Sequence, residues 1–250
     1  MLAKRVITTL TFNEGVLFRT KLFEPDYRYT SNFVDTWSVD EIIILDISRI
    51  YNTNIKKKFL ELVKKFSENC FVPLTVGGKI KNLKNVSDLM MMGADKISLN
   101  TSAIINPKLI TEISESYGAQ AVVVSIDVKK KGKGYEVFSH NGSRPTGLNP
   151  EKWAKKCEEL GAGEILITSI DRDGFLNGFD LELCKKIKCS VRLPVLALGG
   201  CGSWQHMADA FNKTDIDAVC TQNIFHFTEE SIKSSKVFLD SKNINVRRMK

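Results

Sequence analysis

Two apolar segments of this sequence have the same character, but only one of them ends in a carboxylate. In VVVSIDVKK the apolar run ends at Asp127, and 116 residues earlier VITTLTFNEG carries Thr11 at the matching place. A carboxylate at a strand end can take up or release a proton in catalysis, whereas a threonine hydroxyl does not ionise near neutral pH. Asp127 is therefore a candidate for acid–base chemistry, and Thr11 marks a position where that chemistry is missing.

Two glycine pairs and two polar pairs follow other apolar segments. Gly77-Gly78 and Gly199-Gly200 form the first set, and Asn100-Thr101 and Gln222-Asn223 form the second. Glycine lets backbone N–H groups approach a phosphate closely, and a following helix start adds further donors. Because the pattern occurs twice, it favours a ligand with a phosphate at each end. Tight turns without a ligand are the alternative.

Short apolar runs alternate with amphipathic segments along the whole chain. Runs that are apolar throughout indicate strands buried on both faces, as in a parallel sheet. Eight such units predict a closed (β/α)8 barrel, with a doubly wound open sheet as the alternative. The expected strands are 5–10, 41–46, 74–76, 96–99, 121–126, 164–168, 195–198 and 218–221. The expected helices include 55–67, 83–92, 107–117, 149–160 and 180–188.

The sequence repeats itself at about half its length, which favours the barrel over the open sheet. DEIIILDISR matches GEILITSIDR, VPLTVGGKI matches LPVLALGGCG, and GADKISLN matches TDIDAVCTQN. Similarity at a fixed offset is the mark of internal duplication. We expect one domain over residues 1–250, built from half-barrels at about 1–120 and 121–250. The excursion at 129–148, rich in glycine and lysine, should be a surface hairpin or a flap over the active site.

Composition excludes several classes of protein. The chain has 250 residues, 43% hydrophobic and 26% charged residues, and a net charge of +7, which are ordinary values for a globular domain. No apolar run is long enough for a membrane helix, and no signal peptide is evident. Six scattered cysteines and three separated histidines follow no metal-ligand spacing. We therefore expect a cytoplasmic protein without metal or cofactor, and no nucleic-acid or membrane partner.

Several motifs together resemble one family over essentially the whole chain. They are MLAKRVI, DEIIILDIS, PLTVGGKI, GADKISLNT, AVVVSID, GAGEILITSIDRDG, GGCG, NIFHF and the ending NVR. The chain is similar to the cyclase subunit of imidazole glycerol phosphate synthase, the HisF family. The resemblance implies a (β/α)8 barrel paired with a glutaminase (HisH-like) subunit, whose ammonia passes through the barrel. At the far face of the barrel, the ammonia attacks a bisphosphorylated ribulosyl aminoimidazole carboxamide.

The resemblance assigns catalysis to two aspartates, and this chain has one of them. Asp127 matches the second, while the first is replaced by Thr11. The nearest carboxylate, Glu14, should point elsewhere. Two opposed carboxylates can divide the roles of acid and base, but one alone cannot. Enzyme activity of the lyase or cyclase type is therefore left open.

The resemblance also implies a set of substrate-binding residues, and some of them depart from the family. Arg19 stands for a lysine, Lys79 for a glycine, and Leu198 and Asn223 for serines. Lys79 would place a bulky cation in one phosphate site. The residues expected to bind phosphate or substrate are Gly78, Lys79, Asn100, Thr101, Asp173, Gly174, Gly199, Gly200, Gln222, Asn223 and Arg19.

At the other end of the barrel the family pattern is intact. The resemblance implies an ammonia gate at the start of the strands, an interior lined by small polar residues, and a contact with the glutaminase. The gate would be Arg5, Glu41, Lys96 and Glu164, the tunnel Thr75 and Ser98, and the partner contact Asp95. Structural ion pairs and ordinary barrel layers are the alternative interpretations. Burying a network of charges seldom adds to stability, however, because the desolvation cost offsets the attraction between the charges.

Loss of the first aspartate is similar to a divergent branch of the family that makes acetamidino sugars for surface polysaccharides. The segment LFEPDYRYTSNFVDTW also resembles that branch. Our leading hypothesis is a subunit that conducts ammonia to a separate sugar amidotransferase for amidation of an N-acetyl sugar. The first alternative is a working cyclase subunit of histidine biosynthesis. The second is a non-catalytic scaffold that activates the glutaminase.

Overall fold

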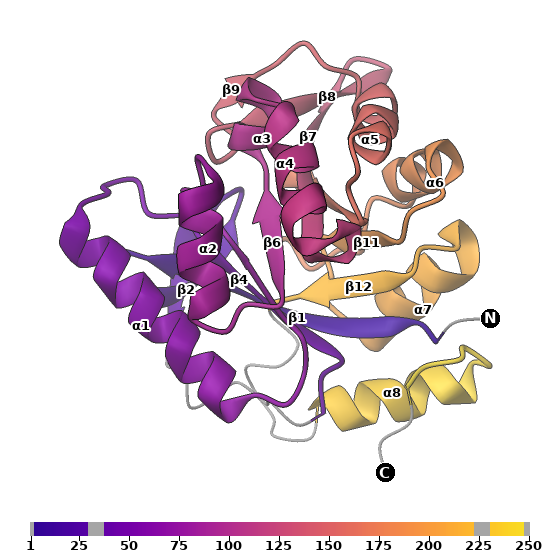
Figure 1. Cartoon of the computed structure of the whole chain (residues 1–250). Coiled ribbons are helices and arrows are strands. Elements are labelled where there is room, and N and C mark those ends of the chain that lie inside the picture. The colour runs from indigo at the N-terminus through magenta and orange to yellow at the C-terminus, as the bar shows by residue number, and fades with distance from the viewer. Residues whose placement is uncertain (1–2, 30–37, 223–230, 248–250) are drawn as a thin grey trace.

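Eight parallel strands close into a barrel surrounded by helices (Figure 1). The structure is a computed structural model that describes residues 3–29, 38–222 and 231–247. The order of neighbouring strands around the barrel is β10, β11, β12, β1, β4, β5, β6 and β7, and the ring closes because β7 pairs with β10. The barrel strands are β1 (Arg5–Asn13), β4 (Glu41–Asp46), β5 (Leu74–Gly77), β6 (Lys96–Leu99), β7 (Val122–Lys131), β10 (Glu164–Ser169), β11 (Val195–Leu198) and β12 (Ala218–Thr221). The predicted barrel is confirmed, and the open-sheet alternative is wrong.

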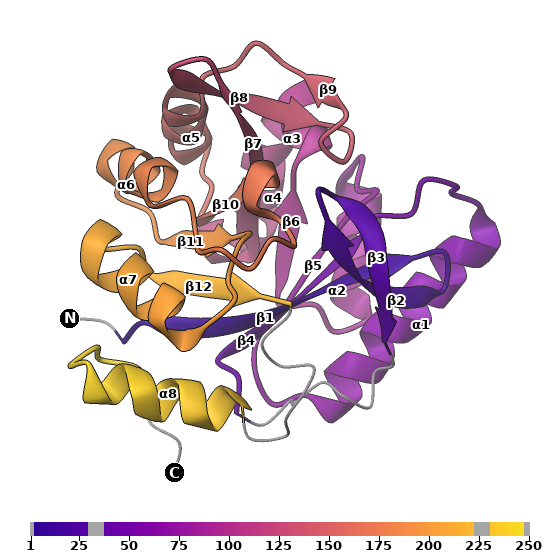
Figure 2. The same ribbon diagram turned by 180° about the vertical axis from the view of Figure 1, so that it is seen from behind.

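Two barrel strands run well past their predicted ends. β1 continues to Asn13 because its last residues pair antiparallel with β2 (Val16–Lys21), which in turn pairs with β3 (Glu24–Tyr29). β7 continues to Lys131 because it pairs antiparallel with β8 (Gly134–Ser139), which is followed by the short β9 (Arg144–Pro145). The second excursion is the hairpin expected at 129–148. The β2–β3 hairpin was not predicted (Figure 2).

The helices bury one apolar face each against the outside of the barrel. Side chains of Asn52, Asn82, Asn149, Asp180 and Ser203 accept hydrogen bonds from the first turns of five helices, which satisfies donors that a helix start leaves free. The helices are α1 (Thr53–Asn69), α2 (Leu83–Met91), α3 (Thr101–Ile105), α4 (Lys108–Tyr117), α5 (Pro150–Glu159), α6 (Leu181–Ser190), α7 (Trp204–Thr214) and α8 (Ser231–Ser241), with short 3-10 turns at Ala119–Ala121 and Ile170–Arg172. The five predicted helices are present to within two residues at each end.

The apolar core has two layers because strand side chains alternate between the two faces of the sheet. The larger layer lies between strands and helices. The smaller layer fills the barrel and consists of Ile7, Ile43, Val123, Leu166, Leu196, Leu198, Ala218 and Cys220. Within the described residues, no helix is long and apolar enough to cross a membrane.

A buried ion pair fixes the last helix to the first strands. Lys236 on α8 donates to the carboxylate of Asp40 at 2.6 Å, and both side chains are less than a tenth exposed. The other carboxylate oxygen of Asp40 accepts from the backbone N–H of Val6 at 2.8 Å. α8 lies beside β1 near both chain ends (Figure 1). This pair therefore holds the C-terminal helix on the barrel.

We predict that Lys236→Ala destabilises the protein much more than Lys233→Ala, an exposed position on the same helix. Removing one partner of a buried pair leaves an uncompensated charge, which costs about 3–5 kcal/mol, whereas an exposed substitution changes stability by about 0.5 kcal/mol or less. Urea unfolding followed by circular dichroism measures both. Equal unfolding free energies for the two variants would contradict the role given to the pair.

Candidate functional site

A pocket of 1020 Å³ opens where the barrel strands end. Every barrel strand contributes to its lining at, or just beyond, its C-terminal end. These contributions are Thr11 from β1, Leu45 from β4, Gly78 after β5, Asn100 after β6, Asp127 from β7, Thr168 from β10, Leu198 from β11 and Gln222 after β12. This is the end at which barrel enzymes carry their active sites.

Asp127 and Thr11 face each other across this pocket. In the ring of eight strands, β1 is the fourth strand from β7 in either direction, so the two strands lie on opposite walls. Both side chains are buried and line the pocket. Asp127 accepts a hydrogen bond from the hydroxyl of Ser125 at 3.2 Å. The sequence-predicted pair of positions is therefore brought together.

Burial gives Asp127 the proton affinity that acid–base chemistry needs. Desolvation raises the pKa of Asp127 to about 7, and the charge of Asp173 also raises it, while hydrogen bonds from Ser125 and Thr168 act in the opposite direction. A carboxyl group with a pKa near the working pH can serve as acid or base. Asp127 is thus suited to move a proton at neutral pH.

Thr11 uses its hydroxyl structurally. The Oγ1 atom donates a hydrogen bond to the backbone carbonyl of Phe18, across the β1–β2 pairing. Glu14, three residues on, is exposed and lies outside the pocket lining; its backbone N–H donates to the hydroxyl of Ser48 at 2.8 Å. No carboxylate from this segment reaches the pocket wall opposite Asp127.

The expected phosphate-binding residues divide into two groups. Gly78, Lys79, Asn100, Thr101, Asp173 and Gln222 line the pocket. Gly174, Gly199, Gly200 and Arg19 are absent from its lining, and Asn223 lies outside the described residues. Arg19 is on β2 and forms an ion pair with Asp26.

Close packing explains why glycines occur after β10 and β11. A Cβ atom on Gly199 would lie 2.6 Å from the carbonyl oxygen of Ser169, and one on Gly174 would lie 2.7 Å from the Cα atom of Lys21. Both residues also have positive φ angles, which glycine adopts without strain. Their presence is therefore accounted for without a ligand.

Lys79 is held in an unusual backbone conformation inside the pocket. Its φ angle is 58°, in the left-handed region that costs a side-chain-bearing residue about 1–3 kcal/mol. The preceding Gly78 packs against the backbone of Asp46, where a Cβ atom would not fit. Burial raises the pKa of Asp46, and the nearby charge of Lys79 opposes part of this rise. Burial lowers the pKa of His140, and the charges of Arg144 and Lys79 lower it further. A cation is thus fixed at this side of the pocket.

Residues of the hairpin that follows β8 also line the pocket, and the sequence did not indicate them. His140 donates its backbone N–H to the hydroxyl of Thr101 at 2.9 Å, and the amide of Asn141 donates to the carbonyl of Ile47 at 3.0 Å. These two contacts hold the loop between β8 and β9 in the pocket lining. The only sequence signal was the flap expected at 129–148, which gave no residue at its tip.

Four charged residues close the opposite end of the barrel in a ring of ion pairs. Arg5 bridges Glu41 at 3.0 Å and Glu164 at 2.9 Å. Lys96 bridges the same glutamates at 2.9 Å and 3.1 Å. Burial lowers the pKa of Arg5, but the negative charges of Glu164 and Glu41 outweigh it and leave that pKa above its ordinary value. The four residues that the family resemblance assigned to the gate therefore form one continuous network.

The two expected tunnel residues lie at different depths of the barrel. The hydroxyl of Thr75 donates to Glu41 at 2.6 Å, so Thr75 belongs to the ring. Ser98 is buried and lines the pocket. The interior apolar layer lies along the barrel between these two polar ends. Ring, apolar layer and pocket thus follow one another along the barrel axis.

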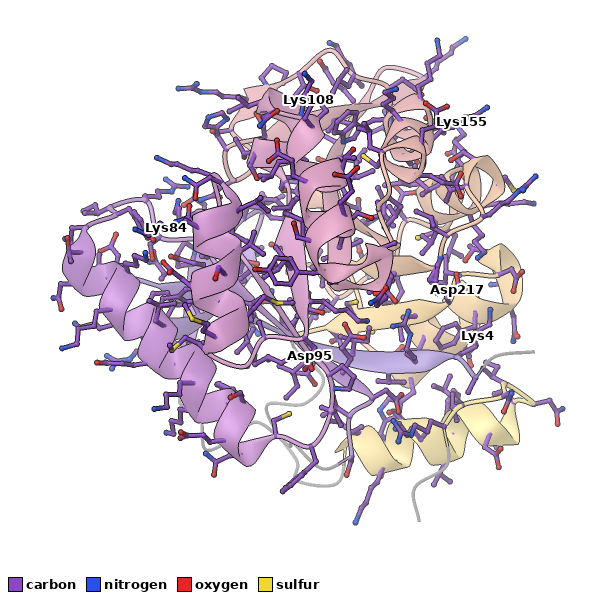
Figure 3. The ribbon with its side chains drawn as sticks, viewed as in Figure 1. Lys4, Lys84, Asp95, Lys108, Lys155 and Asp217 are labelled. Carbon is purple, nitrogen blue, oxygen red and sulfur yellow. The ribbon has the colours of Figure 1, made fainter. Side chains whose placement is uncertain are left out.

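Asp95 is exposed just before β6, at the N-terminal end of the strands (Figure 3). Its carboxylate accepts from the backbone N–H of Leu74 at 2.8 Å. It also borders a second hollow of 510 Å³, which includes the exposed Phe71. In the described part of the chain, no three His, Cys, Asp or Glu side chains gather as metal ligands would.

Comparison with known proteins identifies the family of this chain. The family model described as histidine biosynthesis protein matches residues 10–231. "Imidazole glycerol phosphate synthase subunit HisF" of Chloroherpeton thalassium is 44% identical over 252 residues, covering 99% of this chain and 100% of the relative. The protein of the same name from Clostridium botulinum is 42% identical over 254 residues, with the same coverage. The chain therefore belongs to the HisF family of histidine biosynthesis proteins.

Proposed function

We propose that this chain is the ammonia-using synthase subunit of a complex of the imidazole glycerol phosphate synthase type. Its substrate would be the bisphosphorylated ribulosyl aminoimidazole carboxamide, bound in the pocket. The relatives named above match along their full length. They favour this cyclase function, the first alternative of the sequence analysis, and give no support to the acetamidino-sugar hypothesis.

The observation that carries the proposal is the arrangement of the two barrel ends. The ring of Arg5, Glu41, Lys96 and Glu164 closes one end, and the pocket with Asp127 opens at the other. Ammonia in bulk water becomes protonated and loses its nucleophilic lone pair, so enclosure protects its reactivity. An apolar interior between a charged entrance and a reactive pocket suits passage of the neutral molecule.

A glutaminase subunit is the partner that this arrangement needs. It would dock at the N-terminal end of the strands, where the exposed Asp95 borders the hollow with Phe71. Ammonia released there would meet the ion-pair ring directly. The ring also accepts a hydrogen bond from Thr75 on β5, and breaking one of its ion pairs would open the entrance.

A second candidate function is supported by one specific observation, the pairing of Thr11 with the Phe18 carbonyl in place of a catalytic carboxylate. Together with the cation at Lys79, it would fit a chain that passes ammonia on for amidation of an N-acetyl sugar. A separate sugar amidotransferase would then be required as a third component.

We predict that the purified protein converts the bisphosphorylated ribulosyl substrate when supplied with excess ammonium salt at mildly alkaline pH. Asp127→Asn should lower turnover at least about 100-fold, because an amide cannot exchange a proton as a carboxyl does. Thr11→Asp should retain turnover. Loss of substrate absorbance measures all three. Inactivity of both the unmodified protein and Thr11→Asp would overturn the cyclase proposal in favour of the second candidate.

We also predict that Ser98→Trp abolishes glutamine-dependent product formation in the complex, because an indole at this buried position fills the barrel interior. Glutamine hydrolysis and assembly with the glutaminase should persist, as measured by released glutamate and gel filtration. Ser116→Trp, on the exposed face of α4, is the matched control. Undiminished product from Ser98→Trp would instead support the scaffold alternative.

A further inference from the structure

Attack of ammonia on a carbonyl group needs two proton-transfer groups that share one proton. As the C–N bond forms, a carboxylate takes a proton from nitrogen while a carboxylic acid gives one to the carbonyl oxygen. The roles then reverse: the new acid protonates the departing hydroxyl, which leaves as water, and the other carboxylate takes a second proton from nitrogen. The products are an imine and water, and the pair returns to its starting state.

Asp127 supplies one member of such a pair, and Thr11 does not supply the other. Asp46 and Glu24 also line the pocket, as does Asp173. Asp46 is the last residue of β4 and lies on the outer face of the strand, next to Phe12 of the outer core. One of its carboxylate oxygens accepts a hydrogen bond from the N–H of Ser48 at 2.9 Å. Glu24 is exposed and forms an ion pair with Arg49.

Asp173 lines the same pocket as Asp127 and comes just after the neighbouring strand. It follows β10, the strand that pairs with β7 through Thr168 and Asp127. Its side chain is buried, lines the pocket, and accepts from the N–H of Phe23 at 3.0 Å. Asp173 is also the one carboxylate among the described residues whose charge acts detectably on Asp127.

We propose that Asp173 is the second acid–base residue of this chain, working with Asp127 in place of the carboxylate that Thr11 lacks. This inference rests on the proposed function, because it concerns the same ammonia-dependent reaction. It goes beyond the substrate-binding role that family resemblance gives to the loop after β10.

Electrostatics supports one shared proton. Two nearby buried carboxylates resist simultaneous ionisation, so one of them holds a proton at neutral pH. Burial raises the pKa of Asp173, and the charge of Asp26 on β3 does so too. Hydrogen bonds from Phe23 and Thr20, and the charge of Arg19 on β2, lower it. Asp127 is surrounded by the hydroxyls of Ser125 and Thr168 and by Asp173 itself.

Asp173 has a structural task as well, and the test must separate the two. Its carboxylate and its backbone carbonyl both accept hydrogen bonds from the β2–β3 turn, from Phe23 at 3.0 Å and Leu22 at 3.2 Å. Asp173→Asn keeps an oxygen acceptor for Phe23 but removes the negative charge. Asp171→Asn is the matched control, because Asp171 is exposed on the same segment and accepts from the N–H of Lys130 at 2.7 Å.

The first measurement follows the carboxyl carbons of carbon-13-labelled aspartates by NMR across pH. We expect Asp127 to titrate near pH 7. Its midpoint should move to lower pH in Asp173→Asn, since the neighbouring negative charge is gone, and stay in place in Asp171→Asn. An unchanged midpoint in Asp173→Asn would overturn the pairing.

The second measurement is ammonium-dependent turnover of the bisphosphorylated ribulosyl substrate. Asp173→Asn should lower kcat about 100-fold or more while KM changes about threefold or less. Thr11→Asp placed in the Asp173→Asn protein should restore part of the loss, because it returns a carboxylate to the wall opposite Asp127. Asp171→Asn should match the unmodified protein.

The outcomes separate this inference from the function on which it rests. A raised KM with kcat retained in Asp173→Asn, or a lowered kcat without rescue by Thr11→Asp, would reduce Asp173 to a binding or anchoring residue and leave the proposed function intact. Absence of turnover by the unmodified protein would overturn the proposed function, and the inference with it.

Discussion

The pairing of β10 with β7 closes the sheet, and closure determines which side chains share the barrel interior. Once the strands form a ring, every second residue of each strand points inward. Ile7 and Val123 belong to the interior layer, and Thr11 and Asp127 lie four residues further along the same strands. Arg5, two residues before Ile7, therefore joins the ring at the other end. Entrance, conduit and pocket depend on this alternation.

Much of this could be read from the sequence because buried parallel strands leave a strong signal. Runs such as 42–45 and 165–167 are apolar throughout, so the positions and the order of their strands were predictable. The ends of β1 and β7 were not, because these two strands continue into hairpins whose pairing depends on tertiary contacts. The placement of Asn141 in the pocket lining had no local signal for the same reason. The half-length repeat, with half-barrels at about 1–120 and 121–250, stays a prediction.

The two ends of the barrel meet opposite electrostatic requirements. At the entrance, each of the four charges has two opposite neighbours, which offsets the desolvation that makes isolated buried charges costly. In the pocket, Asp127 has no cation as an ion-pair partner among the described residues, and its desolvation is relieved by protonation instead. The charges at the entrance are paired with one another, while the unpaired carboxyl of Asp127 is free to exchange its proton. The same barrel thereby separates a fixed charge network from a titrating group.

Thr11 and Asp173 are connected through the β2–β3 hairpin, which gives the missing carboxylate a physical context. The hydroxyl of Thr11 donates to the Phe18 carbonyl and so ties β2 to β1. The turn at the end of the same hairpin then presents the N–H of Phe23 to Asp173. An ionised aspartate at position 11 could not donate to a carbonyl, so it would lose this attachment. A hydroxyl at position 11 and a carboxylate at position 173 thus belong to one arrangement, in which the hairpin is held down at both its base and its tip.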